Sequence, residues 1–263
     1  MDVVEVLPEL HLLRFPVGQA YLWCDGDELT LIDAGTIGAA PLIADAVRGL
    51  GLHPRDVRRI VLTHFHEDHA GGAGEFAALS GAPVLAHRLD APFVRGDEPG
   101  PPPLFEDWER PIFAEVAKLL PPPSDEPVLP SDVRELEDGE VLDFGGGARV
   151  VSVPGHTEGS IGLHLPSHGV LFTGDAVAAA PEHGGVVMGV FNLDRTRTGE
   201  SFRKLAALDA DVACFGHGDP VIGDASSALR EAFERDHGHA PAGRPVRPGR
   251  PPPGRARSPA PAP

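Results

Sequence analysis

Short apolar runs, separated by turn residues, make up the first part of the chain. The earliest runs are rich in Val, Leu, Ile and aromatic residues and are divided by Pro8, Gly18 and the Asp25-Gly26-Asp27 turn. This pattern is typical of an antiparallel meander. We expect its strands over Val3–Leu7, Leu10–Phe15, Ala20–Cys24 and Glu28–Asp33.

The pattern then changes to helical spacing. Apolar positions recur along Pro41–Leu50, which begins with proline and is followed by Gly51; these residues commonly start and stop a helix. The run Arg59–Thr63 is short and apolar, as in a buried strand. A helix, a strand and a second short helix are expected next, over Gly74–Ser80, Pro83–His87 and Leu89–Val94.

Proline marks a change of character between Asp97 and Ser131, where prolines flank one helix-like stretch, Ile112–Leu120. Because proline lacks an N–H and fixes φ, regular strand pairing is excluded at both flanks. We predict an insertion at about 97–131 rather than part of the core. Its aromatic side chains are expected to pack onto the body, with an apolar substrate pocket or a dimer interface as alternatives: Phe105, Trp108 and Phe113.

A second group of strands and helices follows the insertion. The expected strands are Val133–Leu136, Glu140–Phe144, Ala148–Val153, Ser160–Leu165, Gly169–Thr173 and Val212–Phe215, and the expected helices are Ser201–Leu208 and Ala225–Arg235. Two groups of strands, each followed by helices, predict two packed sheets with helices outside. We expect one large domain over residues 1–239 and a disordered Pro- and Arg-rich tail over 240–263.

Charge limits the partners of the folded part. The net charge is −17, and residues 240–263 hold five arginines and no acid, so the remainder carries −22. An acidic body repels polyanions, so neither nucleic acid nor an anionic membrane is expected as a partner. The two cysteines, Cys24 and Cys214, form no disulfide framework, and the acidic N-terminus lacks a signal-peptide pattern. Both features favour a cytoplasmic protein.

The densest polar signal is the string His64-Phe65-His66-Glu67-Asp68-His69, directly after the apolar run Arg59–Thr63. Neutral imidazole and carboxylate are the ligands that zinc and similar divalent ions select. Core packing gives no reason for so much titratable polarity at the end of a strand. The string therefore predicts a metal site.

Three further polar residues each follow an expected strand. His156 lies in a Pro-Gly-His-Thr turn, Asp175 follows Thr173-Gly174, and His217 stands between two glycines. Loops at strand ends commonly carry functional groups, and the glycines allow the close backbone approach that a crowded site requires. These residues are candidates to complete the metal site.

The order of these motifs resembles that of the metallo-β-lactamase superfamily: HxHxDH, then Pro-Gly-His-Thr, Gly-Asp and Gly-His-Gly. The resemblance covers the chain up to the tail. The resemblance implies an α/β fold, an αββα sandwich of two mixed β-sheets flanked by helices, with a dinuclear metal site along one edge. Zinc is the expected metal, and the scaffold also takes iron or manganese. The implied ligands are His64, His66 and His156 for one ion, Asp68, His69 and His217 for the other, and Asp175 as the bridge.

Two divalent ions about 3.5–4 Å apart share a water molecule and lower its pKa. The expected protein is a hydrolase that uses a metal-bridging hydroxide on a small ester, thioester or lactone. Asp68 is also the candidate catalytic base. Asp33 and Thr63 are expected to orient ligands, although a turn or capping role for Asp33 stays open. His183, in an expected loop over 176–198, either borders the pocket or lies at the surface.

Two other reaction classes use this scaffold. Persulfide dioxygenases are similar at HxHxDH but use one iron, so the metal content separates them from a hydrolase. Nucleases of the superfamily carry an added domain, for which the insertion at 97–131 is too short. They would also have to bind a polyanion against a body of charge −22.

Within the hydrolases, the string Thr63–Gly72 resembles that of glyoxalase II thioesterases. Those enzymes follow the last metal-binding histidine with a helical domain that contacts glutathione, whereas about one helix is expected after His217. N-acyl homoserine lactonases share the ligand set but have a tyrosine near the pocket, and the one tyrosine here, Tyr21, lies on an early strand. The bridging Asp175 disfavours a true β-lactamase. The identity of the small-molecule substrate stays open.

Overall fold

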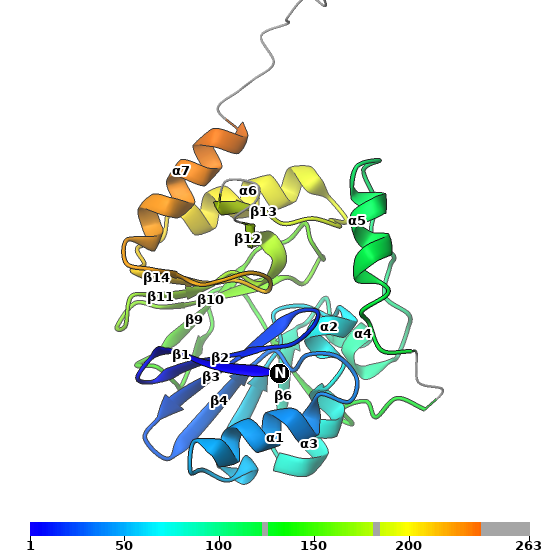
Figure 1. Cartoon of the computed structure of the whole chain (residues 1–263), viewed down its shortest axis with the longest axis vertical. Coiled ribbons are helices and arrows are strands. Elements are labelled where there is room, and N and C mark those ends of the chain that lie inside the picture. The colour runs from blue at the N-terminus through cyan, green and yellow to red at the C-terminus, as the bar shows by residue number, and fades with distance from the viewer. Residues whose placement is uncertain (123–125, 181–184, 238–263) are drawn as a thin grey trace, which may run out of the picture.

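The computed structural model describes residues 1–122, 126–180 and 185–237, and within them two β-sheets face each other (Figure 1). The first sheet contains, in hydrogen-bonded order, β1 (Asp2–Leu7), β2 (Leu10–Arg14), β3 (Gln19–Asp25), β4 (Glu28–Ile32), β5 (Val57–Val61), β6 (Val84–His87) and β7 (Val133–Leu136). Its first four strands form an antiparallel meander, and β4 to β7 are parallel.

The second sheet is also mixed. Its strands, in hydrogen-bonded order, are β15 (Val221–Ile222), β14 (Val212–Cys214), β11 (Val170–Phe172), β10 (Ile161–Leu165), β9 (Ala148–Ser152) and β8 (Val141–Leu142). Only β11 and β14 pair in parallel among these described strands. A separate hairpin of β12 (Val177–Ala180) and β13 (Gly185–Met188) lies beside this sheet.

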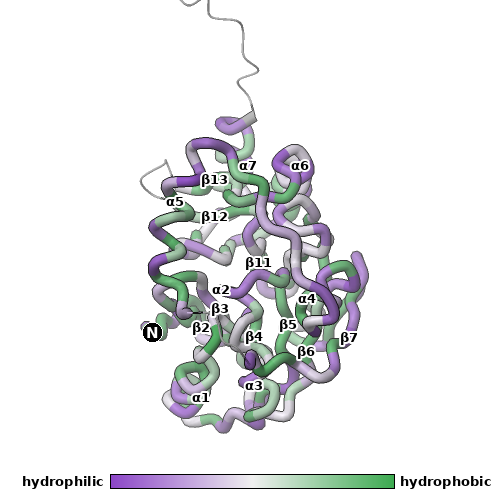
Figure 2. The backbone as a smooth tube through the Cα atoms, turned by 90° about the vertical axis from the view of Figure 1, so that its right-hand side faces the viewer, coloured by the Kyte–Doolittle hydropathy of each residue, from purple (hydrophilic) through white to green (hydrophobic). Residues whose placement is uncertain are grey.

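Helices cover the outer face of each sheet, as Figure 1 shows. The first sheet packs against α1 (Ala40–Gly49) and α3 (Ala73–Ser80), and the second packs against α6 (Arg195–Ala206) and α7 (Ala225–His237). Successive side chains of a strand point to opposite faces. Leu13 therefore joins the core under α1 and α3, whereas Leu12 joins the core between the sheets. In Figure 2, hydrophobic positions run along β4, β5 and β6 accordingly.

The expected αββα sandwich of two mixed sheets is confirmed. Helix α6 and the hairpin β12–β13 differ from the elements predicted from the sequence, and each difference has a local cause. Helix α6 begins at Arg195 rather than at the expected Ser201, because the Asp194 carboxylate accepts the N–H of Arg197 at 3.0 Å and caps the helix. The hairpin β12–β13 lies within residues 176–198, which were expected to form a loop. Its first strand, β12, is Val-Ala-Ala-Ala, and alanine gives a weak strand signal.

The insertion runs along one side of the sandwich, where α5 (Glu109–Val116) stands between α6 and α4 (Ala91–Arg95) in Figure 1. Helix α5 begins at Glu109, before the expected Ile112, because Pro111 lies in its first turn, where proline is tolerated. His183 and the expected tail over 240–263 lie outside the described residues. Among the described helices, none combines the length and the apolar character needed to cross a bilayer.

Candidate metal centre

The loops that follow four strands meet at one edge of the sandwich. The loop after β5 and the short helix α2 (Glu67–Ala70) come from the first sheet, and the loops after β9, β11 and β14 come from the second. The turn η2 (Gly174–Ala176) follows β11. The structure brings together all seven side chains expected as ligands: His64, His66, Asp68, His69, His156, Asp175 and His217.

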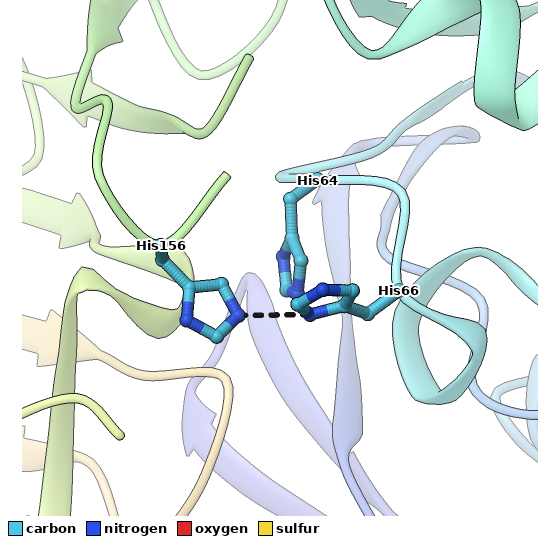
Figure 3. Close-up of side chains that lie close together, drawn as sticks. All are labelled: His64, His66 and His156. Atoms are coloured by element: carbon cyan, nitrogen blue, oxygen red, sulfur yellow. Dashed lines mark hydrogen bonds between the residues drawn. The ribbon is translucent and has the colours of Figure 1, made fainter. Parts of the chain in front are cut away.

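Three imidazoles form the first group, His64, His66 and His156, with one ring nitrogen of each within 4.8 Å of the others. In Figure 3 the rings of His66 and His156 face each other from different loops, and His66 Nδ1 lies 2.9 Å from His156 Nε2. Burial lowers the pKa of each histidine, to about 3 for His66. The rings are therefore neutral, which is the state of histidine that binds metal ions.

The second group is Asp68, His69 and His217. Asp68 Oδ2 lies 3.4 Å from His69 Nε2 and 3.2 Å from His217 Nε2, and the two nitrogens are 3.4 Å apart. Ligand atoms about 2.0–2.1 Å from one zinc ion, at the corners of a tetrahedron, lie about 3.3–3.4 Å from one another. These three side chains have the spacing of a zinc site.

Asp175 lies between the two groups. Its carboxylate oxygens are 3.4 Å from His69 Nε2, 3.2 Å from His217 Nε2 and 3.6 Å from His156 Nε2. Gly216 makes room for this carboxylate, because a Cβ at that position would lie 1.8 Å from Asp175 Oδ1. The arrangement places one carboxylate within reach of both groups, as a bridging ligand requires.

The charges of the cluster favour a cation at its centre. Burial raises the pKa of Asp68 and Asp175, but the facing imidazoles of His69 and His217 outweigh burial and hold both pKa values well below the ordinary range. Burial lowers the pKa of His217, and the carboxylates outweigh it and raise that pKa to about 10. The carboxylates thus favour a positive charge between them, which a metal ion would supply in place of protons.

Unpaired atoms inside the cluster also favour a cation at its centre. His64 Nε2 and Asp175 Oδ1 are buried without a hydrogen-bond partner in the described structure. A buried acceptor left unpaired costs about 1–3 kcal/mol, and more when it is charged. A divalent cation would satisfy both lone pairs, so the donor set fits the metal ions that the sequence predicts.

Asp33 and Thr63 orient two of the imidazoles. The Thr63 hydroxyl donates to Asp33 Oδ2 at 2.9 Å, so it accepts the Nδ1–H of His64 at 3.0 Å. Asp33 Oδ2 also accepts the Nδ1–H of His69 at 3.0 Å, and Asp33 Oδ1 accepts the backbone N–H of Thr63 at 2.7 Å. These bonds place the hydrogens on Nδ1 and leave Nε2 of His64 and His69 free for a metal.

The Asp33 carboxylate bonds Thr63 and His69 rather than capping a helix. Its backbone is left-handed, with a φ of 58°, which is uncommon outside glycine. The turn into this conformation follows β4 and aims the carboxylate at the loop after β5. These bonds are the ones that the orienting role predicted for Asp33 and Thr63 requires.

Asp90 is a fully buried carboxylate that no sequence motif predicted as part of the site. Its Oδ2 accepts the backbone N–H of Phe65 at 3.1 Å and the hydroxyl of Thr157 at 2.7 Å, and its Oδ1 accepts the N–H of Gly159 at 2.8 Å. Asp90 thus joins the loop of His64 and His66 to the loop of His156. Its position before an Ala-Pro pair suggests a helix cap, yet the side chain makes no cap hydrogen bond.

The sequence profile of the metallo-β-lactamase superfamily matches residues 13–217, which include every residue of the cluster. The chain belongs to this superfamily. Its solved members share the architecture: the metallo-β-lactamase family protein TTHA1429 from Thermus thermophilus superposes with a TM-score of 0.65 at 29% identity, covering 89% of this chain and 80% of that one.

Two curated relatives cover most of the chain. The probable metallo-hydrolase YflN of Bacillus subtilis is 30% identical over 83% of this chain and 87% of its own length. A hydroxyacylglutathione hydrolase of Cereibacter sphaeroides is 29% identical over 72% of this chain, and the match spans 57% of that enzyme. At the level of class, the family and the cluster of metal-ligand residues together support a metallo-hydrolase.

A cavity of about 580 Å³ opens directly beside the cluster. Its walls include the candidate ligands His66, Asp68, His156, Asp175 and His217. Its volume lies in the range of about 300–1,000 Å³ that is typical of small-molecule sites. Tyr21 lies outside the lining; it is buried, and its hydroxyl donates to the backbone oxygen of Phe215 at 2.8 Å, which holds the loop of His217.

The insertion forms one wall of this cavity. The rings of Phe105 and Phe113 lie 4.7 Å apart, and both contact Phe191 of the body, at 5.8 and 5.4 Å between ring centroids. Phe113 and Phe191 also line the cavity. Trp108 lies away from it, under the guanidinium of Arg195. The aromatic residues therefore pack onto the body, and Phe113 in addition faces the site.

Proposed function

We propose that the protein is a dinuclear-metal hydrolase that acts on a small ester, thioester or lactone. The observation that carries this proposal is the convergence of seven imidazole and carboxylate side chains, in three overlapping groups, beside one cavity that five of them line. His64, His66 and His156 would hold one ion and Asp68, His69 and His217 the other, with Asp175 between them. Two such ions supply an activated water and polarise a substrate carbonyl.

Other steps of the proposed reaction depend on side chains of the protein. Asp68 Oδ2 faces His69 and His217, which leaves Oδ1 to accept the proton of the attacking water. Asp33 and Thr63 hold the imidazoles of His64 and His69 in one tautomer. The walls of the cavity position the carbonyl and limit the access of bulk water.

Zinc is the metal that we propose. Imidazole nitrogens and carboxylate oxygens are its common ligands, and the spacing of Asp68, His69 and His217 suits tetrahedral bonds of its length. The relative named as a hydroxyacylglutathione hydrolase supports a thioester among the candidate substrates.

The test is an activity panel on the zinc-loaded protein with a thioester, a lactone, an aryl ester, a phosphoester and a chromogenic β-lactam. We expect turnover of at least one of the first three and its loss in His66→Ala and after chelation. The control is His53→Ala, which changes an exposed histidine remote from the cluster. Turnover that His66→Ala and chelation leave unchanged would refute the proposal, as would activity confined to the phosphoester or the β-lactam.

A further inference from the structure

The walls of the cavity differ sharply in chemistry. One side carries the metal-ligand cluster, and the opposite side carries apolar side chains of the insertion, Ile112, Phe113 and Val116 on α5 and Leu119 just after it. Val17, on the loop before β3, adds a further apolar surface. In Figure 2 hydrophobic and hydrophilic positions alternate along α5, as expected for a helix with one apolar face.

This apolar wall is incompletely covered by the protein. Ile112 keeps 38% and Leu119 keeps 59% of its surface exposed in the described structure. Apolar side chains gathered around a small-molecule cavity generally serve the apolar part of its ligand. The wall and the cluster line the same cavity, so a substrate that the cluster acts on would lie along this wall.

Away from the candidate ligands, the charges of the cavity disfavour an anionic group on the acyl part of the substrate. Of the described residues that line it, Arg14 is the one permanent cation, and it is ion-paired with Asp219. Glu67 also lines the cavity and is acidic, whereas bound metal ions would offset the charges of Asp68 and Asp175. An anionic acyl group would therefore meet, among these lining residues, no unpaired guanidinium or ammonium group.

The insertion is held in place against the body. The buried carboxylate of Glu109 accepts the N–H of Phe191 at 3.2 Å and the N–H of Glu106 at 2.9 Å. Phe191 has a left-handed φ of 59°, an unfavourable conformation for a bulky residue. Strain of this kind persists only where the surroundings fix it, so the apolar wall is a defined part of the site.

We propose that the substrate is a neutral ester or thioester with an extended apolar acyl group, which lies along Ile112 and Val116 while its carbonyl faces the metal cluster. This inference rests on the proposed hydrolase function and adds the substrate class. Water attacks the acyl carbon, the bond to the alcohol or thiol breaks, and the products are a carboxylate and the protonated leaving group.

The test is a chain-length series of p-nitrophenyl esters, from acetate through butanoate and hexanoate to octanoate, with the zinc-loaded full chain. A fully buried methylene corresponds to about a fourfold change, so we expect kcat/KM to rise about two- to fourfold per methylene. In the double variant Ile112→Asn/Val116→Asn we expect a smaller increase of kcat/KM per methylene. The matched control, Ala114→Asn, changes an exposed residue of the same helix that lies outside the lining and keeps the rise.

Binding without turnover separates this inference from the proposed function. We expect octanamide, a neutral analogue of the acyl group, to displace a fluorescent apolar probe from the full chain, more weakly in Ile112→Asn/Val116→Asn than in Ala114→Asn. Such displacement without hydrolysis of any ester or thioester would overturn the hydrolase and keep the acyl pocket. Hydrolysis that is independent of chain length and of both α5 substitutions would overturn the acyl pocket alone. The acyl pocket would also be overturned if light scattering shows a dimer of the wild-type chain and a monomer of Ile112→Asn/Val116→Asn, while both proteins keep the same chain-length preference.

Discussion

Two buried carboxylates outside the ligand set, Asp33 and Asp90, determine how the candidate ligands are held. Asp33 fixes the hydrogens of His64 and His69 through Thr63 and through its own bond to His69. Asp90 bonds no ligand side chain and instead joins the backbone of two ligand loops. Preorganisation by such groups commonly changes metal affinity 10–100-fold.

Replacing Asp33 by Asn should weaken zinc binding at least about tenfold. Asparagine tolerates the left-handed backbone, but its amide group supplies one acceptor oxygen where the carboxylate supplies two, so the bond to His69 or to Thr63 is lost. Competition with a chromophoric chelator measures the affinity. The control is Asp45→Asn on the exposed face of α1. An affinity within twofold of wild type would show that Asp33 does not orient His69.

Asp90 should give a pH-dependent contribution to stability. Burial raises its pKa to about 6 and outweighs the hydrogen bonds that lower it, whereas an unfolded Asp releases its proton near pH 4. The folded chain therefore binds this proton more tightly. Its contribution to the free energy of unfolding is fully present below about pH 4 and is lost as the pH rises to about 6.

Urea denaturation of the zinc-free chain and of Asp90→Asn measures this contribution. Between about pH 4 and 6 the stability of wild type relative to the variant should fall, by at most about 1.4 kcal/mol per pH unit, because the amide of the variant cannot titrate. The difference between the two proteins cancels the titration of the histidine cluster. A difference that stays constant or grows with pH would contradict the assignment.

At the scale of elements, strands and strand-end loops were predictable, whereas the sequence left open whether the insertion faces the substrate pocket. The meander and the strands before each ligand loop follow from short apolar runs bounded by Gly and Pro. The candidate ligands at the ends of these strands could be predicted because the HxHxDH, Gly-Asp and Gly-His-Gly motifs are each local in the sequence. The hairpin β12–β13 was missed because the three alanines of β12 give little strand signal. The approach of Phe191 to the insertion depends on contacts distant in sequence.

Glu109 gives an element-scale prediction, because it fixes α5 through the N–H groups of Phe191 and Glu106. In Glu109→Ala these donors lose their buried acceptor, a loss of about 1–3 kcal/mol in local stability. Hydrogen exchange at residues 104–119 should accelerate about tenfold. Glu115→Ala removes an exposed carboxylate of the same helix, which pairs with Lys118, and serves as control. Equal exchange in both variants would contradict the anchoring role.

At the scale of the whole molecule, the candidate metal centre joins the two sheets. His64, His66, Asp68 and His69 follow strands of the first sheet, and His156, Asp175 and His217 follow strands of the second. Because a ligand that binds only the folded state stabilises it, ions bound here should stabilise the sandwich as a unit. The sequence could predict the members of this centre, but their spacing follows from how the two sheets pack.

Chelation should therefore lower the melting temperature of the whole chain. A metal at about 1,000 times its Kd stabilises by about 4 kcal/mol, which corresponds to roughly 10 °C for a domain of this size. Differential scanning calorimetry with and without chelator measures the shift, and readdition of zinc should restore it. A melting temperature that is unchanged by chelation would show that the ligand cluster holds no structural metal.

The metal content of the purified full chain tests the central claim most directly. The account predicts two equivalents of zinc per chain by elemental analysis and about one in His217→Ala, which removes a ligand from one group and leaves the other intact. A single equivalent of iron in the wild-type chain, or no tightly bound metal after incubation with zinc, would contradict it.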